Sequence, residues 1–396
     1  MDVSDLRIAL FSGNYNYTRD GANQALNRLV GSLLARGAKV RVYSPKVANP
    51  DFPPTGDLVG LPNVPMPVKG RGEYRMPTHL GAAVKRDLAA FAPNIVHLSS
   101  PDPSAHAALR WARAQGVPVL ASVHTRFETY PRYYNMAFLE PLIVKGLRRF
   151  YNRCDALVAP SQSMIDELLA MDMHTRIGLW SRGVDRTIFS SARRDPEWRR
   201  SLGLADDDVG IVFLGRLVME KGLDVFAEAI VRLREQGVAH KVLVIGDGPA
   251  RGWFEANLPG AIFAGFKTGD ALGQALASGD VFFNPSVTET FGNVTLEAMA
   301  SGLPVVAAGA TGSASLVADG VTGRLVAPSG SMKADAAAFA AALAPYCTDP
   351  ALRSAHGAAG ETRACEYSWE AINAVVADTY VKLVDERGAA KARQAA

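Results

Sequence analysis

Short apolar segments alternate with helical stretches along the whole of this 396-residue chain. In the first half, the apolar segments that we expect to be strands are Arg7–Ser12, Lys39–Ser44, Ile95–Leu98, Pro118–Val123 and Ala156–Ala159. Strands that alternate with helices form a parallel sheet with helices on both faces. The pattern therefore predicts an α/β fold with a doubly wound parallel sheet.

The same alternation starts again in the second half of the chain. Its expected strands are Ile211–Leu214, Lys241–Ile245, Ile262–Ala264, Val281–Asn284 and Pro304–Ala307. A polar segment, Asp185–Leu204, separates the two halves. We predict two Rossmann-like domains, residues 1–190 and 191–368, that face each other across a cleft. Ligands of such sheets bind beyond the carboxyl ends of the strands, so we expect the site in that cleft.

Charge and composition narrow the kind of partner. Net charge is only +3, but residues 1–190 hold 23 basic and 15 acidic side chains. A basic half suggests an anionic surface, and a membrane face fits better than nucleic acid because no basic run or basic-aromatic motif is present. We find no secretory signal and no apolar segment long enough to cross a bilayer. The three cysteines are widely spaced, so we expect free thiols in the cytoplasm and no metal site. The basic half can also associate with the inner face of the membrane.

A segment in the second half carries two glutamates eight positions apart, Glu289 and Glu297. The first lies in a Thr-Phe-Gly-Asn loop, and the second lies in the helix that follows. The start of a helix offers unpaired backbone N–H groups and the positive end of the helix dipole, which together can hold a phosphate. Carboxylates on both sides can accept hydrogen bonds from sugar hydroxyls. The segment therefore indicates a nucleotide-sugar site.

Two cations follow the first expected strand of the second half. Arg216 comes directly after Gly215, and Lys221 directly before Gly222. Arginine can bind two phosphate oxygens at once and lysine supplies a point charge, so this loop suits a diphosphate. Gly246 and Gly248 end the next strand, where we expect an ordinary turn that borders the nucleotide.

Residues 285–304 resemble the signature of the retaining glycosyltransferases of family 4, which have the two-domain GT-B fold. The similarity includes Phe-Gly after the first glutamate, Ala-Met-Ala-Ser-Gly after the second, and the strand Gly-Leu-Pro-Val-Val. It implies that Glu289 binds the donor sugar, that Glu297 binds the ribose, and that Arg216 and Lys221 neutralise the leaving diphosphate. It also implies donor contacts from the residues between the glutamates, which are Thr290, Phe291, Gly292 and Asn293. A last helix at about 369–388 would cross back to the first domain.

The resemblance also assigns residues in the first domain. His124, at the end of an expected strand, would be catalytic together with Glu289, Arg216 and Lys221. Gly21 would approach the diphosphate, although relatives often have a second glycine where this chain has Ala22. Asp20 and Asn23 can instead be helix caps.

Three further residues are assigned with less support from the pattern. Tyr130 and Arg132 would line the acceptor side of the site. Arg182 would contact the donor or pack at the hinge.

The expected activity is transfer of a sugar from a UDP- or GDP-sugar to an acceptor hydroxyl, with retention and without a metal or cofactor. Several stretches, among them Trp180–Asp185, resemble the branch that contains sulfoquinovosyl-diacylglycerol synthases and bacterial lipid mannosyltransferases. This favours a lipid acceptor, and the basic, apolar helix expected at Met136–Asn152 can lie on anionic lipid. Polysaccharide or lipopolysaccharide assembly remains open. So do a 2-epimerase of the same fold and a nucleotide-binding module without activity.

Overall fold

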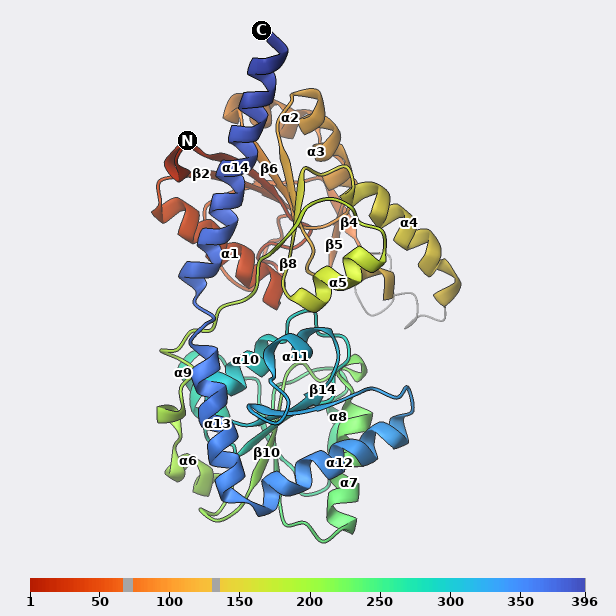
Figure 1. The fold of residues 1–396 in the computed structure, drawn as a ribbon, viewed down its shortest axis with the longest axis vertical. Coiled ribbons are helices and arrows are strands. Elements are labelled where there is room, and N and C mark those ends of the chain that lie inside the picture. The colour runs from red at the N-terminus through yellow and green to blue at the C-terminus, as the bar shows by residue number, and fades with distance from the viewer. Residues whose placement is uncertain (67–73, 130–135, 396) are drawn as a thin grey trace. The chain divides into compact units, whose positions relative to one another are not determined.

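The computed structural model describes residues 1–66, 74–129 and 136–395. The chain divides into two compact units. Unit 1 comprises Met1–Ser181 and Trp369–Ala396, and unit 2 comprises Arg182–Ser368. Figure 1 shows the ribbon, with many of its helices and strands labelled.

Unit 1 is built on a parallel sheet of seven strands. In spatial order these are β3 (Asp57–Gly60), β2 (Lys39–Ser44), β1 (Arg7–Phe11), β6 (Ile95–Leu98), β7 (Val119–Ser122), β8 (Ala156–Ala159) and β9 (Ile177–Leu179). Every residue of β6, β7 and β8 is buried, as expected for strands covered on both faces. A small antiparallel pair, β4 (Asn63–Pro65) and β5 (Arg75–Pro77), lies apart from this sheet.

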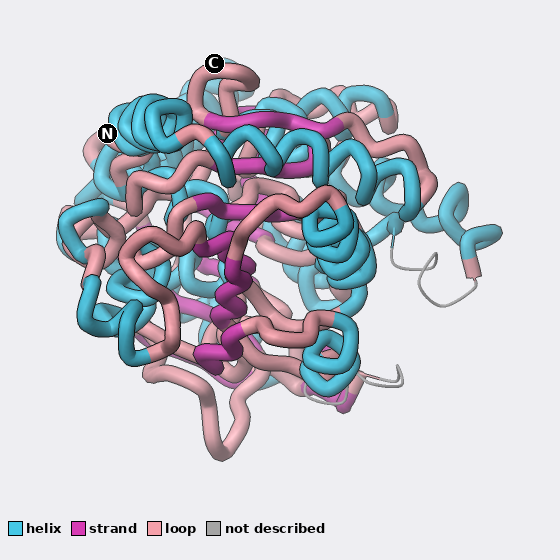
Figure 2. The backbone as a smooth tube through the Cα atoms, turned by 90° about the horizontal axis from the view of Figure 1, so that it is seen from below, coloured by secondary structure: helices cyan, strands magenta, loops and turns pink. Residues whose placement is uncertain are grey.

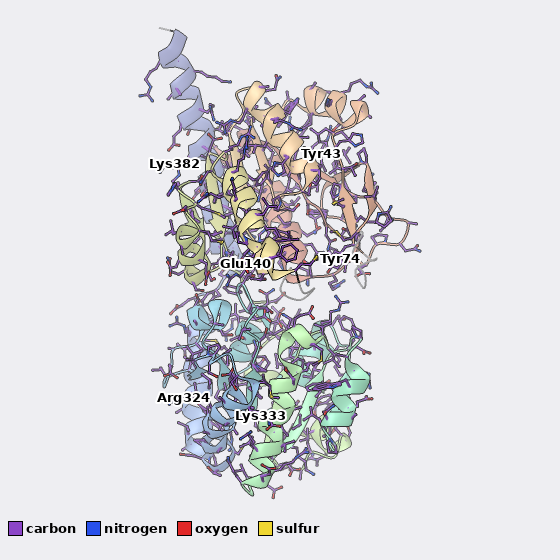
Figure 3. The ribbon with its side chains drawn as sticks, turned by 90° about the vertical axis from the view of Figure 1, so that its right-hand side faces the viewer. Tyr43, Tyr74, Glu140, Arg324, Lys333 and Lys382 are labelled. Carbon is purple, nitrogen blue, oxygen red and sulfur yellow. The ribbon has the colours of Figure 1, made fainter. Side chains whose placement is uncertain are left out.

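Helices cover the sheet of unit 1. They are α1 (Gly21–Ala35), α2 (Ala82–Phe91), α3 (Pro103–Ala114), α4 (Glu140–Tyr151), α5 (Gln162–Ala170) and α14 (Trp369–Ala395), with short 3-10 turns η1 (Val3–Asp5) and η3 (Ala137–Leu139). Side-chain contacts hold them in place. For example, the Tyr43 hydroxyl of β2, labelled in Figure 3, donates a hydrogen bond of 2.8 Å to Asp87 of α2.

Two predicted helices differ from those observed. The segment predicted as one helix from Met136 divides into η3 and α4. Pro141 stands in the first turn of α4, where its missing N–H costs no hydrogen bond, so the regular helix begins there. The last helix does not end near Gly388 but continues to Ala395, since most residues after Gly388 are strong helix formers.

Helix α14 is fastened to the sheet of unit 1 by buried polar contacts. His97 of β6 lies between the Tyr380 hydroxyl of α14, at 2.5 Å from Nδ1, and the Ser122 hydroxyl, at 2.8 Å from Nε2. The Trp180 indole N–H donates to the Asn373 side chain at 3.4 Å. Burial lowers the pKa of His97 to about 3, so its ring is neutral in the folded protein.

Unit 2 has a parallel sheet of six strands. Their order is β12 (Ile262–Gly265), β11 (Lys241–Ile245), β10 (Gly210–Leu214), β13 (Val281–Asn284), β14 (Val305–Ala308) and β15 (Gly323–Val326). The helices are α6 (Pro196–Ser201), α7 (Leu223–Glu235), α8 (Arg251–Asn257), α9 (Gly269–Ala277), α10 (Asn293–Ala300), α11 (Thr311–Leu316), α12 (Met332–Thr348) and α13 (Pro350–Ala364), with 3-10 turns η4 (Ser191–Arg193) and η5 (Met219–Lys221). Figure 2 shows strands running between helices. Buried phenylalanines in edge and stacked contacts fill one side of the core of unit 2, among them Phe213, Phe226 and Phe254.

The predicted fold class is confirmed by these two doubly wound parallel sheets. Three edge or near-edge strands, β3, β9 and β15, were not predicted, because each is short and partly exposed. Among the described residues, no helix has the length and apolar character that crossing a bilayer requires.

Candidate active site

The strand order of unit 2 changes direction between β10 and β13. β10 pairs with β11 on one side and with β13 on the other, so the connections from these strands leave in opposite directions. At such a point the loops beyond the carboxyl ends leave a place for a ligand. Of the predicted donor residues, Arg216 and Lys221 follow β10, and residues 289–292 lie between β13 and α10.

Glycines allow the loop after β10 and the loop after β11 to touch. Gly215 after β10 has a φ of 153°, and Gly246 after β11 has a φ of 139°. A Cβ on Gly246 would lie 1.9 Å from the Gly215 carbonyl oxygen, which no side chain tolerates. The Leu217 N–H donates to the Asp247 carbonyl at 2.9 Å across the same contact. The loop that carries Arg216 is therefore held against the loop after β11, while the Arg216 side chain is exposed.

Lys221 and Glu289 come together from loops 68 residues apart. The Lys221 ammonium lies 2.7 Å from a Glu289 carboxylate oxygen. The side chains are 28% and 17% exposed, so solvent screens this ion pair only in part. The Thr288 hydroxyl also donates to the Glu220 carbonyl at 3.3 Å, which joins the same two loops. The structure thus brings together a cation predicted to bind phosphate and a carboxylate predicted to bind sugar.

The start of α10 is shaped by two glycines. Gly292 has a φ of 90° and immediately precedes the helix, with no side-chain cap on the first turn. Gly312 donates its N–H to the Glu289 carbonyl at 2.9 Å, and a Cβ on Gly312 would lie 2.6 Å from the Phe291 carbonyl carbon. Gly312 therefore fixes the loop from Glu289 to Phe291, and sequence reasoning did not identify it. The only local signal was a glycine shortly after a buried strand.

Buried polar residues beneath α10 hold the helix in place. Asn284, the last residue of β13, donates to the Thr295 hydroxyl at 3.2 Å and accepts from the Ser286 N–H at 3.1 Å. Thr295 is wholly buried and lies 3.5 Å from the Ser313 hydroxyl. These contacts were also not predicted, although a polar residue at the end of an apolar strand is a usable signal. They position the helix whose first turn carries the predicted phosphate contacts.

The remaining donor-side residues divide by exposure. Asn293 and Glu297 lie one turn apart on the same side of α10 and are half-buried, and Thr290 in the preceding loop is half-buried too. The Phe291 ring is buried and packs on Tyr367, with 6.0 Å between ring centroids. Only the backbone of Phe291 is therefore placed to face a ligand.

In unit 1, the first turn of α1 is capped by its own side chains. The Asp20 carboxylate accepts from the Asn23 N–H at 2.8 Å, and the Asn23 side chain accepts from the Asp20 N–H at 3.1 Å. The alternative role of these two residues as helix caps is what the structure shows. Gly21 begins the helix directly after this cap.

His124 follows β7 and is half-buried. Its ring meets the edge of Trp180, with 5.1 Å between ring centroids, and Trp180 is only 1% exposed. Because the Trp180 indole is hydrogen-bonded to Asn373, helix α14 holds in place the ring that His124 packs against. This arrangement restricts the orientation of the His124 ring.

A charged cluster follows His124 in the same loop. Arg126 lies 2.7 Å from the buried carboxylate of Glu128 and 3.1 Å from the more exposed carboxylate of Glu167 on α5. Tyr130 and Arg132 lie outside the described residues. Arg182, at the start of unit 2, is 4% exposed.

No cluster of three or more histidine, cysteine, aspartate or glutamate side chains suited to a metal occurs in the described part of the chain. Among the described donor-side residues, the charged side chains are Arg216, the paired Lys221 and Glu289, and Glu297. A diphosphate could be neutralised by the cations and by the first turn of α10.

Comparison with known proteins gives two family matches. Residues 19–187 match the model described as "Glycosyltransferase Family 4", and residues 208–349 match "Glycosyl transferases group 1".

Relatives cover most of the chain. A "Sulfoquinovosyl transferase SQD2" of Arabidopsis thaliana is 33% identical over 300 residues, which are 74% of this chain but only 57% of that protein. A "GDP-mannose-dependent alpha-mannosyltransferase" of Mycolicibacterium smegmatis is 32% identical over 81% of this chain and 84% of its own length. An "Alpha-monoglucosyldiacylglycerol synthase" of Acholeplasma laidlawii is 22% identical over 76% of this chain and 80% of its own length.

Solved structures share the fold. A sucrose-phosphate synthase from Thermosynechococcus elongatus superposes with a TM-score of 0.75 at 21% identity, covering 96% of this chain and 99% of that one.

Proposed function

This chain belongs to glycosyltransferase family 4 and is a retaining hexosyltransferase that uses a nucleotide sugar, and we propose that its acceptor is a membrane glycolipid or another lipid-linked hydroxyl. The donor in this proposal is a UDP- or GDP-sugar. The observation that carries the donor site is the meeting of Lys221 and Glu289 at the switch point of the sheet of unit 2.

The donor-side residues have distinct proposed roles. Arg216 and Lys221 neutralise the diphosphate as it leaves, helped by the N–H groups at the start of α10. Glu289 accepts hydrogen bonds from hydroxyls of the donor sugar, and Glu297 accepts from the ribose. In front-face transfer the leaving phosphate helps to take the acceptor proton, so these residues supply orientation and charge stabilisation.

In unit 1, His124 is proposed to contact the donor sugar, with its ring in the orientation that Trp180 allows. Gly21, Arg182, Tyr130 and Arg132 stay proposals from family similarity.

A lipid acceptor is supported by the outer side of α4 and η3. Phe138 is 78% exposed and Leu142 is 67% exposed, while Lys145 and Arg149 on the same short segment are exposed cations. Apolar and basic side chains together suit contact with an anionic membrane. The Acholeplasma laidlawii relative is an alpha-monoglucosyldiacylglycerol synthase, which also supports a lipid acceptor.

The test is transfer of radiolabelled sugar from UDP- and GDP-sugars into lipid extracts and purified diacylglycerol-based acceptors. We expect label in the organic phase with one of the two bases, and loss of that label in the Glu289→Gln variant. Label that enters only polysaccharide or lipopolysaccharide would replace the lipid acceptor. Release of an epimerised nucleotide sugar without any acceptor would exclude transfer as the activity.

A further inference from the structure

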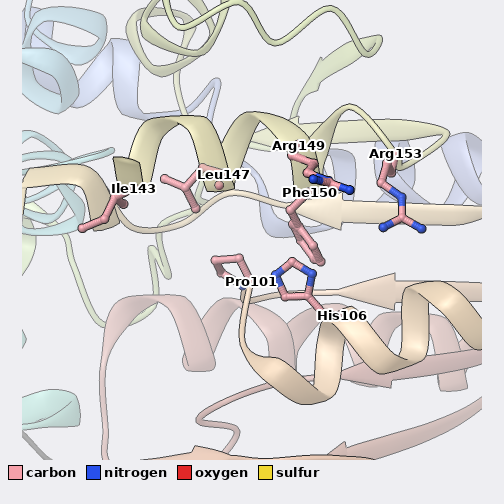
Figure 4. A pocket seen from close by; sticks show the side chains of 8 residues that line it. Pro101, His106, Ile143, Leu147, Arg149, Phe150 and Arg153 are labelled. Atoms are coloured by element: carbon pink, nitrogen blue, oxygen red, sulfur yellow. The ribbon is translucent and has the colours of Figure 1, made fainter. Parts of the chain in front are cut away.

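A pocket of about 310 Å³ lies in unit 1 between the start of α3 and one side of α4 (Figure 4). The loop after β6 and α3 contribute Pro101 and His106, and the remaining lining residues come from α4 and the residues directly after it. Among the latter are Gly146, Arg149 and Arg153. The proposed transfer reaction gives the pocket itself no role.

Side chains along this side of α4 change character in a fixed order. Leu142, Gly146 and Arg149 follow at intervals of four and three residues, which places them on one side of the helix. Arg153 follows two residues after the end of α4 and also lines the pocket. Phe138 precedes Leu142 by four residues in η3 and is exposed with it. The surface therefore passes from exposed apolar side chains, through a residue without a side chain, to two guanidinium groups.

Gly146 is not required by the packing of the protein itself. A Cβ built on Gly146 meets no atom within 4 Å, and the residue lies inside a regular helix. Glycine at such a position destabilises the helix relative to alanine. What glycine provides here is open space beside the pocket.

The cationic end of the pocket is available to an anion. Neither Arg149 nor Arg153 forms an ion pair with a carboxylate of the described residues, whereas the neighbouring Arg148 lies 2.9 Å from Asp172. The Arg113 guanidinium donates to the Arg153 backbone carbonyl and so fixes the end of the helix. One guanidinium group can bind two phosphate oxygens at once, so these two arginines are suited to bind a phosphate.

His106 adds a polar group to the same pocket. Its ring meets the edge of Phe150, with 4.5 Å between ring centroids, so its position is set by a buried neighbour. Burial lowers the pKa of His106, which favours the neutral ring. A neutral imidazole still has one N–H that can donate to an anionic oxygen.

We propose that this pocket binds the phosphate of one anionic phospholipid, whose glycerol passes over Gly146 and whose acyl chains lie along Leu142 and Phe138. The volume suits a phosphoglycerol headgroup, since ligand pockets begin at about 300 Å³. The inference rests on the proposed membrane contact of α4 and adds a defined lipid site to it. The bound lipid holds the enzyme at the membrane and is not the sugar acceptor.

The test uses dihexanoyl phosphatidylglycerol as a monomer, below its micelle concentration, with the full chain in a calorimetric titration. Gly146→Leu fills the pocket with a better helix former, so the fold should persist, and we expect binding to be lost. Arg149→Gln should weaken binding at least tenfold, because one charged partner of the phosphate is removed. Arg148→Gln is the matched control, since it removes the same charge one residue away from the pocket, and we expect its binding to stay within twofold.

Equal losses in Arg148→Gln and Arg149→Gln would overturn the site in favour of diffuse charge attraction. Displacement of the lipid by inorganic phosphate at similar concentration would show a free-anion site instead. No binding by the wild-type chain would also overturn it.

The outcome is separable from that of the proposed function. This assay contains neither donor nor acceptor, so the expected pattern would support the site even if no lipid acceptor were found. Transfer to a lipid acceptor without this binding pattern would remove the site and leave the proposed function intact.

Discussion

Lys221→Gln should weaken binding of a free nucleoside diphosphate, whereas Glu289→Gln should not. Without a ligand, the Lys221 ammonium lies 2.7 Å from the Glu289 carboxylate. If Lys221 is a phosphate contact, its loss removes a charge-assisted hydrogen bond from the ligand. If Glu289 contacts only the sugar, its loss removes a competitor for the Lys221 ammonium and no contact to the diphosphate.

The expected magnitudes follow from this pair. A hydrogen bond to a charged group contributes about 1.5–3 kcal/mol, so Lys221→Gln should weaken binding of the diphosphate roughly 10- to 150-fold. Glu289→Gln should leave that affinity unchanged or increase it, while turnover with the sugar donor falls. The side chains are only 28% and 17% exposed, so screening should not remove the effect.

Calorimetric titration with UDP and GDP is the assay, and a thermal-shift panel beforehand selects the base that binds. The double variant completes a cycle that measures how strongly the two residues are coupled. Equal loss of free-nucleotide affinity in both single variants would refute the division of roles. No loss in Lys221→Gln would show that this cation does not reach the phosphates.

Three further changes test other parts of the structure. Glu297→Ala should weaken nucleotide binding by about tenfold, because it removes a partner of the ribose hydroxyls, and titration with the free nucleotide checks this. Gly312→Ala should lower turnover on the order of 10- to 100-fold, because its Cβ would lie 2.6 Å from the Phe291 carbonyl carbon and displace the donor loop. The circular dichroism spectrum should stay unchanged, and wild-type turnover would contradict this prediction. Burial lowers the pKa of His97 to about 3, so the unfolded chain is protonated before the folded chain as the pH falls. The unfolding free energy should therefore fall by about 1.4 kcal/mol per pH unit between about pH 6.5 and about pH 3. His97→Gln should remove that part of the acid dependence in urea melts, while His174→Gln on the surface should not.

A prediction about metal concerns the reaction as a whole. Incubation with EDTA should leave transfer intact, since the cations and the start of α10 are proposed to neutralise the diphosphate. A complete loss that a divalent metal restores would contradict this proposal.

Much of the fold could be predicted because its central strands are buried on both faces. β10, β11 and β13 read as unbroken apolar segments, and such segments are distinguished easily from the helices between them. β15 contains an exposed arginine and lies at the edge of its sheet, so its pattern is weaker. The break between η3 and α4 depends on Pro141, whose effect on a helix start is local and was overlooked.

The candidate site was predictable residue by residue but not in its contacts. Glu289 and Lys221 could be identified separately, yet their ion pair depends on β10 and β13 being neighbours in the sheet. The support from Gly312 and Thr295 depends on distances between loops and helices that no spacing in the chain reveals.

The way in which α14 completes unit 1 has a consequence for the order in which the protein is made. Unit 2 is one continuous stretch, Arg182–Ser368, and all of it is synthesised before α14. Unit 1 begins first, but the contacts of His97 with Tyr380 and of Trp180 with Asn373 form only after α14 has been made. Unit 2 therefore needs no segment from outside its own range, whereas unit 1 cannot be completed until the last residues of the chain have been made. A chain that ends just before Trp369 would keep all of unit 2 but would lose the contacts of His97 and Trp180 with α14.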